Sequence, residues 1–245
     1  MDAPEPTAPA RQVTFVHGVG GSPLTWEEQV SKLPPGLPAR APWLRGLRPG
    51  ASGADESFQL ADAAADILMT LQLDGIDRAA IVGHDLGAMV ALQAALQQPD
   101  AVSHLVLVAG RPRPPKSAMR LQRLAVRLMP KRRLAERGVS KERVLEALGT
   151  TFDADGDPAD VRCPTLVVCG AADRVGLPAS RVLAQQIPGA RLEIVEGAGH
   201  DVMHEQTAVF NALLYDFLGH GTPDDLSALE TLDGPATDEH GPADR

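Results

Sequence analysis

The sequence predicts an α/β fold, a mostly parallel, doubly wound sheet with helices on both faces. Two observations lead to this prediction. Short, continuously apolar runs alternate along the chain with longer segments of helical periodicity, which is typical of parallel strands that are buried on both faces. The chain also has 245 residues, a length that suits one such domain with a small insertion.

The first half of the chain alternates three expected strands with three expected helices. The run at 12–18 is rich in β-branched and aromatic residues and stops at glycines, whereas Pro42 weakens the strand at 38–46. Acidic residues occupy the first turn of the helix at 55–73, and Pro99 closes the helix at 86–98. The expected strands are 12–18, 38–46 and 79–83, and the expected helices are 23–33, 55–73 and 86–98.

The second half continues the pattern after an interruption. Residues 111–160 contain two helix-like segments, the first of them basic, and are expected to form a short cap inserted into a domain that spans 12–219. The Pro/Ala-rich start, 1–11, should be loose, and the acidic, Gly/Pro-rich tail, 220–245, should be disordered. The further strands are expected at 103–110, 164–170 and 190–196, and the further helices at 178–187 and 205–219.

Composition excludes several classes of protein. The formal net charge is −9, which argues against a nucleic-acid partner, because such proteins carry clustered positive charge. Cys163 and Cys169 lie in or beside one apolar run and would be too far apart for a disulfide, so free thiols in a reducing cytoplasm are expected. No apolar run is long enough for a membrane span or has the form of a signal peptide. The oligomeric state is left open.

The stretch AIVGHDLGAMVA, residues 80–91, is the most informative part of the sequence. Its order of strand, GHDLG and helix is that of a nucleophile elbow. The residue in the middle of such a turn adopts a strained conformation, so the flanking Gly83 and Gly87 must be small. The elbow residue, here Asp85, then lies at the carboxyl edge of the sheet, where open α/β folds bind ligands.

A second turn, in FVHGVGG at 15–21, follows the first strand. It could present the backbone N–H of Val19 toward the elbow, where the N–H of Leu86 completes an oxyanion hole. The residues expected to support the site are His17 and Gly18 in this turn and Gly83, His84 and Gly87 around the elbow.

Two further polar residues follow strand ends. Asp173 comes after the run at 164–170, and His200 comes after the run at 190–196. The chain order is therefore elbow residue, acid and histidine. Asp201, beside the histidine, is a rival for the role of the acid, as is the group Asp153, Asp155 and Asp157.

Together these motifs resemble the α/β-hydrolase superfamily over residues 12–219. The resemblance implies that His200 is a general base and that Asp173 orients it, in a fold of the α/β-hydrolase type that lacks the usual two N-terminal antiparallel strands. A GHD elbow is similar to those of epoxide hydrolases and of haloalkane and haloacid dehalogenases. In those families the aspartate is the nucleophile, which assigns that role to Asp85.

The chemistry of an aspartate nucleophile agrees with that assignment. A carboxylate is ionised at neutral pH and can attack an sp³ carbon without a base to activate it. Water activated by His200 could then hydrolyse the resulting ester of Asp85. Attack on a simple ester would instead have to form an anhydride. The sequence therefore predicts a cofactor-independent hydrolase that acts on an epoxide or a carbon–halogen bond of a small molecule.

Several residues depart from these families. The single tyrosine, Tyr215, lies in the last expected helix and should pack in the core, although epoxide hydrolases use cap tyrosines. Leu86 stands where the dehalogenases have a tryptophan or an arginine. Trp26 is expected to pack beside the oxyanion turn, and Trp43 could line the pocket. Two alternatives stay open: an esterase-like relative in which Asp85 is an altered nucleophile, and a non-catalytic protein that binds a small molecule.

No metal or nucleotide site is expected. The segment DADGDP, 153–158, resembles a calcium loop but lacks the glutamate at the twelfth position. His200 and His204 have the spacing of a helical zinc pair without the HExxH pattern, and the glycines at 18–21 fit neither a P-loop nor a dinucleotide fingerprint.

Overall fold

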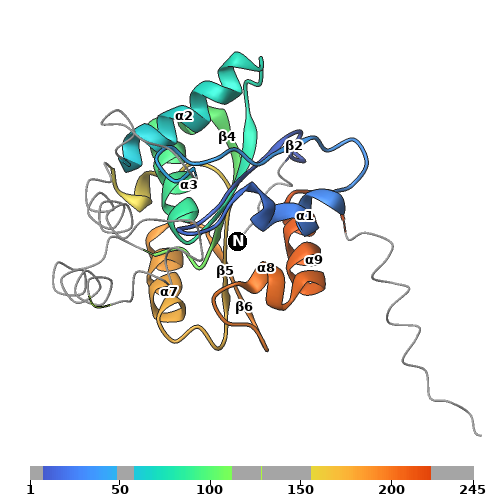
Figure 1. Ribbon diagram of the computed structural model, residues 1–245, viewed down its shortest axis with the longest axis vertical. Coiled ribbons are helices and arrows are strands. Elements are labelled where there is room, and N and C mark those ends of the chain that lie inside the picture. The colour runs from blue at the N-terminus through green and yellow to red at the C-terminus, as the bar shows by residue number, and fades with distance from the viewer. Residues whose placement is uncertain (1–7, 49–57, 112–127, 129–155, 222–245) are drawn as a thin grey trace, which may run out of the picture.

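The computed structural model describes residues 8–48, 58–111, 128 and 156–221, and these residues form one α/β domain (Figure 1). Six strands form a single sheet in the order β2-β1-β3-β4-β5-β6, and every pair of neighbours is parallel. This confirms the predicted fold class. The strands are β1 (Val13–Val16), β2 (Ala39–Arg40), β3 (Ala79–His84), β4 (Val102–Val108), β5 (Thr165–Gly170) and β6 (Arg191–Val195).

The direction of winding changes between β1 and β3. From β1 the chain moves outward to β2, and it then crosses to the other side of β1 to form β3. In open parallel sheets such a switch point leaves a crevice at the carboxyl ends of the two strands. The loops that follow β1 and β3 are the predicted oxyanion turn and the predicted elbow.

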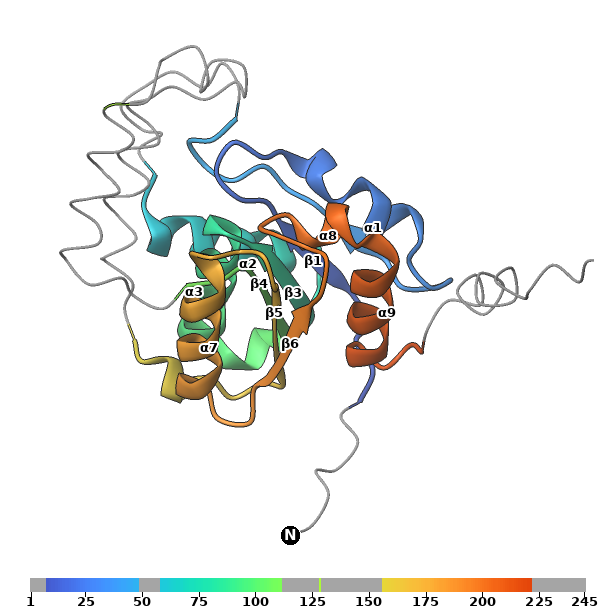
Figure 2. The same cartoon turned by 90° about the horizontal axis from the view of Figure 1, so that it is seen from below.

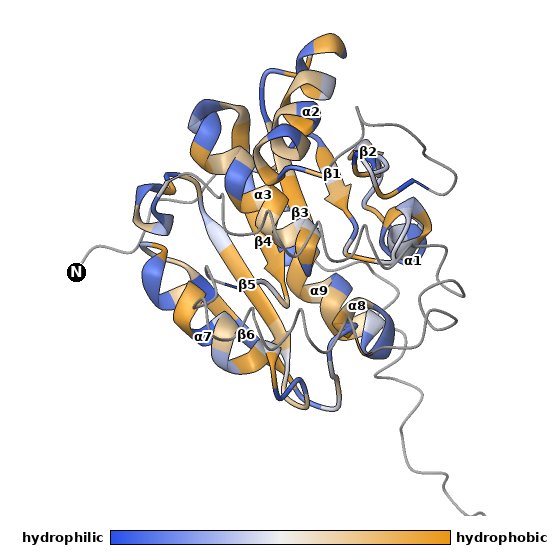
Figure 3. Cartoon of the chain, turned by 60° about the vertical axis from the view of Figure 1, so that its left-hand side comes forward, coloured by the Kyte–Doolittle hydropathy of each residue, from blue (hydrophilic) through white to orange (hydrophobic). Residues whose placement is uncertain are grey.

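Helices cover both faces of the sheet, because successive strand residues point to opposite sides. Ile81 packs among residues of α2 (Leu60–Leu73), α3 (Leu86–Gln97) and α7 (Gly176–Gln186). The next residue, Val82, packs with residues of the short 3-10 helix η1 (Pro23–Trp26) and of α9 (Thr207–Phe217). Figure 2 shows α3 and α7 on one side of the sheet and α1, α8 and α9 on the other, and Figure 3 shows the hydrophobic strands between them.

Some elements differ from their predicted form. The helix expected at 23–33 divides into η1, which Ser22 and Thr25 begin with a capping box, and α1 (Glu27–Ser31). The helix expected at 205–219 is limited to α9, and a separate short helix, α8 (Val202–Glu205), precedes it. Gln206, with a φ of −136° and a ψ of 56°, separates the two helices.

Two predicted boundaries are also corrected. The strand expected at 38–46 is limited to β2, because Pro42 follows closely and cannot donate a ladder hydrogen bond. The helix expected at 55–73 begins only at Leu60, and the start of that prediction lies outside the described residues. Two short 3-10 helices, η3 (Pro99–Ala101) and η4 (Pro158–Asp160), complete the described elements.

The described ends of the domain contact each other. Ala10 is buried, its N–H donates to the Leu218 carbonyl at 2.9 Å, and its carbonyl lies 2.6 Å from His220 Nε2. This residue is therefore held in place, although we expected the segment 1–11 to be loose. The predicted tail beyond 221 and most of the predicted cap, 112–127 and 129–155, lie outside the described residues.

Cys163 and Cys169 are both free and buried, as predicted. Burial raises the pKa of the Cys163 thiol to about 11, so it is protonated at neutral pH. Among the described helices, none is both long and apolar enough to cross a membrane.

Candidate active site

Asp85 occupies a strained turn between β3 and α3. Its φ of 50° and ψ of −111° lie outside the regions that most residues adopt, and its N–H donates to the Val108 carbonyl at 3.0 Å. A Cβ on Gly83 would lie 2.2 Å from the Gly87 carbonyl oxygen, and a Cβ on Gly87 would lie 2.1 Å from that of Val16. The two glycines therefore allow strand, turn and helix to close around Asp85.

The carboxylate of Asp85 lies beside a positive charge that the sequence reading missed. Arg111 Nη2 donates to Asp85 Oδ1 at 2.9 Å, and the Asp85 side chain is 21% exposed. Burial would raise the pKa of Asp85, but Arg111, His84, His200 and a backbone hydrogen bond from Leu86 together hold it below its ordinary value. Asp85 is therefore an anion at neutral pH.

His200 lies between Asp85 and Asp173. Its Nδ1 is 2.8 Å from Asp173 Oδ2, and its Nε2 is 3.9 Å from Asp85 Oδ1. Because Asp173 is an acceptor, Nδ1 carries a proton and Nε2 faces Asp85. The structure thus brings the three predicted residues together in the order acid, histidine and elbow residue.

Asp173 is fixed as an anion. Its side chain is 8% exposed, and Oδ1 accepts hydrogen bonds from the N–H groups of Val175 at 3.1 Å and Gly176 at 2.7 Å. Burial would raise its pKa, but these bonds and the contact with His200 lower it. An anion held in this way can orient the histidine and stabilise its protonated form.

His84 holds the loop that carries His200. Its ring is buried, and Nε2 lies 3.1 Å from the His200 carbonyl oxygen, to which it can only donate. Burial lowers the pKa of His84. His84 was expected to support the site around the elbow, and this contact joins the elbow to the histidine loop. Gly170 permits the same approach, since a Cβ there would lie 2.2 Å from the Gly199 carbonyl oxygen.

The predicted oxyanion turn follows β1 and lies against the elbow. A Cβ on Gly18 would be 3.0 Å from Asp85 Cβ. His17 fixes the turn, because Nδ1 lies 2.9 Å from the Gly18 carbonyl and Nε2 accepts from the Leu44 N–H at 3.2 Å. Burial lowers the pKa of His17, so the ring is neutral. Val19 follows Gly18 in this turn, and its role in an oxyanion hole stays a prediction, as does that of Leu86.

The rival residues lie elsewhere. Asp201 is 58% exposed, and its Oδ1 is 3.6 Å from His84 Nε2. Asp157 caps η4 by accepting from the Ala159 N–H, while Asp153 and Asp155 lie outside the described residues. The Tyr215 hydroxyl donates to the Gln29 carbonyl at 2.8 Å inside the core, where Tyr215 packs in the same cluster as Trp26 and Phe210.

The two tryptophans differ in position. Trp26 is buried against Phe15, with ring centroids 5.1 Å apart. Trp43 is 36% exposed, and its ring meets that of His17 edge-on. Trp26 therefore packs in the core against a residue of β1, and it is Trp43 whose ring lies against His17 of the oxyanion turn.

Arg111 could have been found from its place in the sequence. It follows β4, the neighbour of the elbow strand, by three residues, and parallel strands end at one edge of the sheet. The turn that delivers it is strained at Ala109, which has a φ of 49°, and Ser180 Oγ holds the Gly110 carbonyl at 3.2 Å. The expected cap begins at residue 111, and no role in the site is predicted for Arg111 from the sequence.

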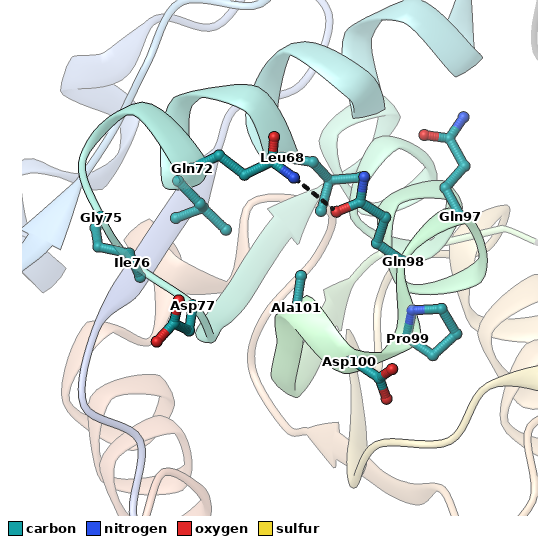
Figure 4. A pocket seen from close by; sticks show the side chains of 11 residues that line it. Leu68, Gln72, Gly75, Ile76, Asp77, Gln97, Gln98, Pro99, Asp100 and Ala101 are labelled. Carbon is teal, nitrogen blue, oxygen red and sulfur yellow. Dashed lines mark hydrogen bonds between the residues drawn. The ribbon is translucent and has the colours of Figure 1, made fainter.

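A cavity of about 690 Å³ lies at the amino edge of the sheet, opposite the carboxyl edge that carries Asp85. It is formed by the end of α2, the end of α3 and the loops that enter β3 and β4, and a hydrogen bond joins Gln72 to Gln98 across it (Figure 4). Because Asp85 is at the carboxyl end of β3, this cavity is separate from the candidate site. Within the described part of the chain, no group of three metal-ligating side chains is gathered.

Known proteins resemble the chain along most of its length. A model of the alpha/beta hydrolase family matches residues 15–213. A protein of Klebsiella pneumoniae (strain 342) named "Putative carbamate hydrolase RutD" is 32% identical, over 90% of this chain and 96% of that protein. A protein of the same name from Caulobacter sp. (strain K31) is 28% identical, over 87% of this chain and 92% of that one. Neither relative is named as an epoxide hydrolase, although the GHD elbow resembles those of epoxide hydrolases.

Solved structures agree with the fold. A hydrolase from Pseudomonas aeruginosa has a TM-score of 0.72 at 21% identity and covers 86% of this chain and 90% of its own. The enol-lactonase from Burkholderia xenovorans LB400 also has a TM-score of 0.72 at 21% identity, over 86% of this chain and 92% of its own. At this identity the likeness concerns the fold alone.

Proposed function

The chain belongs to the alpha/beta hydrolase family, and from this premise we propose that it hydrolyses small molecules through an ester of Asp85. The observation that supports the proposal most strongly is the pair of contacts made by His200, with Asp173 on one ring nitrogen and Asp85 near the other. The substrate would carry an electrophilic sp³ carbon, in an epoxide or a carbon–halogen bond.

In the first step an oxygen of Asp85 attacks that carbon. A carbon–oxygen bond to Asp85 forms, and the bond to the halide or to the epoxide oxygen breaks with its electron pair. A halide leaves as the free anion, whereas the opened epoxide oxygen becomes an alkoxide and takes a proton from water. Because the pKa of Asp85 is lowered, its carboxylate is already ionised and needs no base to activate it as a nucleophile. Arg111, whose Nη2 donates to Asp85 Oδ1 at 2.9 Å, keeps the carboxylate oriented before attack.

In the second step water attacks the carbonyl carbon of the Asp85 ester. His200 Nε2 takes the proton from the water, and Asp173 stabilises the resulting imidazolium. The negative charge that develops on the Asp85 oxygen would be bound by the N–H groups of Val19 and Leu86. Collapse of this intermediate releases the alcohol, to which His200 returns the proton. It leaves Asp85 as a carboxylic acid, which loses its proton to solvent and becomes the starting carboxylate again.

A second candidate follows from the ion pair between Arg111 and Asp85. If Arg111 keeps Asp85 fully engaged, the carboxylate does not attack, and His200 activates water directly against an ester-like carbonyl. The name of the sequence relatives, putative carbamate hydrolase, concerns a substrate of this acyl type. The two candidates differ in whether a covalent intermediate forms on Asp85.

Trapping of that intermediate tests the proposal. The His200→Ala variant is incubated with epoxides, alkyl halides and activated esters, followed by intact-mass and peptide mass spectrometry. Loss of the base should leave attack intact and block hydrolysis, so we expect a stable adduct on Asp85. Turnover of the panel by the wild-type protein without an adduct in the variant would favour the second candidate. Neither turnover nor adduct would favour a binding protein.

The pH dependence of adduct formation in His200→Ala is a prediction of its own. Because the pKa of Asp85 is lowered and the ionised form attacks, the rate should stay constant as the pH falls, down to or below the ordinary pKa of aspartate. In the double variant with Arg111→Met, loss of the neighbouring positive charge should move the fall in rate to higher pH. A measured midpoint above the ordinary aspartate value in the single variant contradicts the argument.

Gly176→Ala tests the role of Asp173 indirectly. A Cβ on Gly176 would lie 2.1 Å from Asp173 Oδ2, the oxygen that His200 contacts. The substitution should displace the carboxylate and lower kcat by roughly 10²-fold, as expected for a misplaced catalytic group. Asp173→Asn, measured alongside, should lose about 10⁴-fold. Unchanged kcat in both variants would remove Asp173 from the mechanism.

A further inference from the structure

One carboxylate holds the loop that carries His200, and it does so on both sides of that residue. Glu205 Oε2 accepts a hydrogen bond from the Gly199 N–H at 2.7 Å, and Glu205 Oε1 accepts one from the Asp201 N–H at 3.1 Å. Gly199 and Asp201 come directly before and after His200. Hydrogen bonds to a charged acceptor are stronger than those between neutral groups. The Glu205 carboxylate and these two N–H groups, here called the Glu205 clamp, therefore fix the chain on either side of the histidine.

His84 adds a third contact with the same stretch of backbone, because its Nε2 donates to the His200 carbonyl oxygen at 3.1 Å. Gly199 also leaves room for the clamp, since a Cβ there would lie 3.3 Å from each carboxylate oxygen of Glu205. The main chain around His200 is thus bonded at three points to side chains from two different parts of the fold.

Glu205 is itself held in place, because it ends the short helix α8 and that helix is anchored in the core. The Glu205 N–H donates to the Asp201 carbonyl at 2.9 Å. Val202 and Met203 of the same helix are fully buried. The Met203 carbonyl accepts a hydrogen bond from Gln29 Nε2 at 3.1 Å, and Gln29 is buried as well. The clamp therefore connects the backbone around the histidine to the core of the domain.

We propose that Glu205 is a positioning residue for the base, and that its carboxylate holds the His200 ring at the two distances on which the chemistry depends. Those distances are 2.8 Å from Nδ1 to Asp173 Oδ2 and 3.9 Å from Nε2 to Asp85 Oδ1. The side chain of His200 is 39% exposed, so the backbone of its loop has a large share in placing the ring. A displacement of about 1 Å in a catalytic group can lower a rate by roughly 10²-fold.

This role predicts an unequal effect on the two steps of the reaction. The inference rests on the proposed function, in which Asp85 attacks without a base and His200 activates the water that hydrolyses the ester. Glu205 bonds to the backbone and not to the reacting atoms, so its loss should slow hydrolysis of the ester and leave formation of the ester almost unchanged. A residue that only stabilises the fold would affect both steps alike.

The rates of the two steps are measured by quenched-flow mass spectrometry, with a halide or epoxide that the panel identifies. In Glu205→Ala we expect ester hydrolysis to be slower by about tenfold or more, while ester formation stays within about twofold of the wild type. Glu205→Gln keeps one acceptor oxygen and should lie between the two. The control is Glu196→Ala, at an exposed carboxylate on the same loop, and it should match the wild type in both steps. Thermal melts check that each variant is folded.

Amide hydrogen exchange, followed by NMR, measures the clamp without any substrate. The N–H groups of Gly199 and Asp201 should exchange about five- to tenfold faster in Glu205→Ala than in the wild type, the value of one hydrogen bond, and at the wild-type rate in Glu196→Ala. Unchanged exchange in Glu205→Ala, unchanged ester hydrolysis, or equal slowing of both steps overturns the proposal. If no ester forms in any of the proteins while exchange still rises in Glu205→Ala, the clamp stands and the proposed chemistry fails.

Discussion

Asp85→Asn is expected to lower kcat by about 10⁴-fold or more while the protein stays folded. An amide is a poor nucleophile toward an sp³ carbon, so the first displacement should stop. Asparagine tolerates positive φ better than most residues, so it fits the φ of 50° at this turn. Steady-state rates on any substrate from the panel, together with thermal melts, measure both effects.

The control for this variant is Asp201→Asn, at an exposed carboxylate on the loop of His200. Its kcat should stay within about threefold of the wild type, because the carboxylate lies outside the set of Asp85, His200 and Asp173. The intact mass of Asp85→Asn must show that the amide has not reverted to aspartate. Activity above a tenth of the wild type in an intact Asp85→Asn protein would contradict the role of nucleophile.

Gly87→Ala is expected to have the largest effect on stability. Alanine favours a helix over glycine by about 1 kcal/mol, yet here its Cβ would lie 2.1 Å from the Val16 carbonyl oxygen and 2.7 Å from that of His17. Backbone atoms cannot yield as a side chain can, so β1 and α3 must separate. We expect a loss of about 3 kcal/mol and, for a domain of this size, a fall in Tm of roughly 6–12 °C.

Gly75→Ala provides the matched control. Gly75 has a φ of +69°, and a Cβ there would meet no atom within 4 Å. Alanine at that position carries only the left-handed backbone cost of about 1–2 kcal/mol. A thermal melt in which Gly75→Ala is as damaging as Gly87→Ala would show that close approach at the elbow is not what requires glycine.

Much of the fold could be predicted because the apolar runs in the sequence coincide with the strands that are buried on both faces of the sheet. The runs at 79–82, 105–108 and 166–169 within β3, β4 and β5 are apolar at every position, since residues such as Ile81 and Val82 face opposite helical layers. Helix breaks were harder to predict. The division at Gln206 depends on contacts of α8 with the His200 loop, where Glu205 accepts from the Gly199 N–H at 2.7 Å.

The site was predictable to the extent that it follows strand ends. Asp85, Asp173 and His200 each come directly after a parallel strand or a few residues beyond it, so one edge of the sheet collects them. Arg111 was not found, because its pairing with Asp85 depends on the strained turn at Ala109.

The most direct test of the account is a single turnover in water labelled with oxygen-18, with wild-type enzyme in excess over an epoxide or halide that the panel identifies. In the double displacement the product oxygen comes from Asp85, and water replaces it on the carboxylate. The account predicts an unlabelled product and a labelled peptide that contains Asp85. A labelled product from unlabelled enzyme would mean that water attacks the substrate directly, and it would contradict Asp85 as the nucleophile.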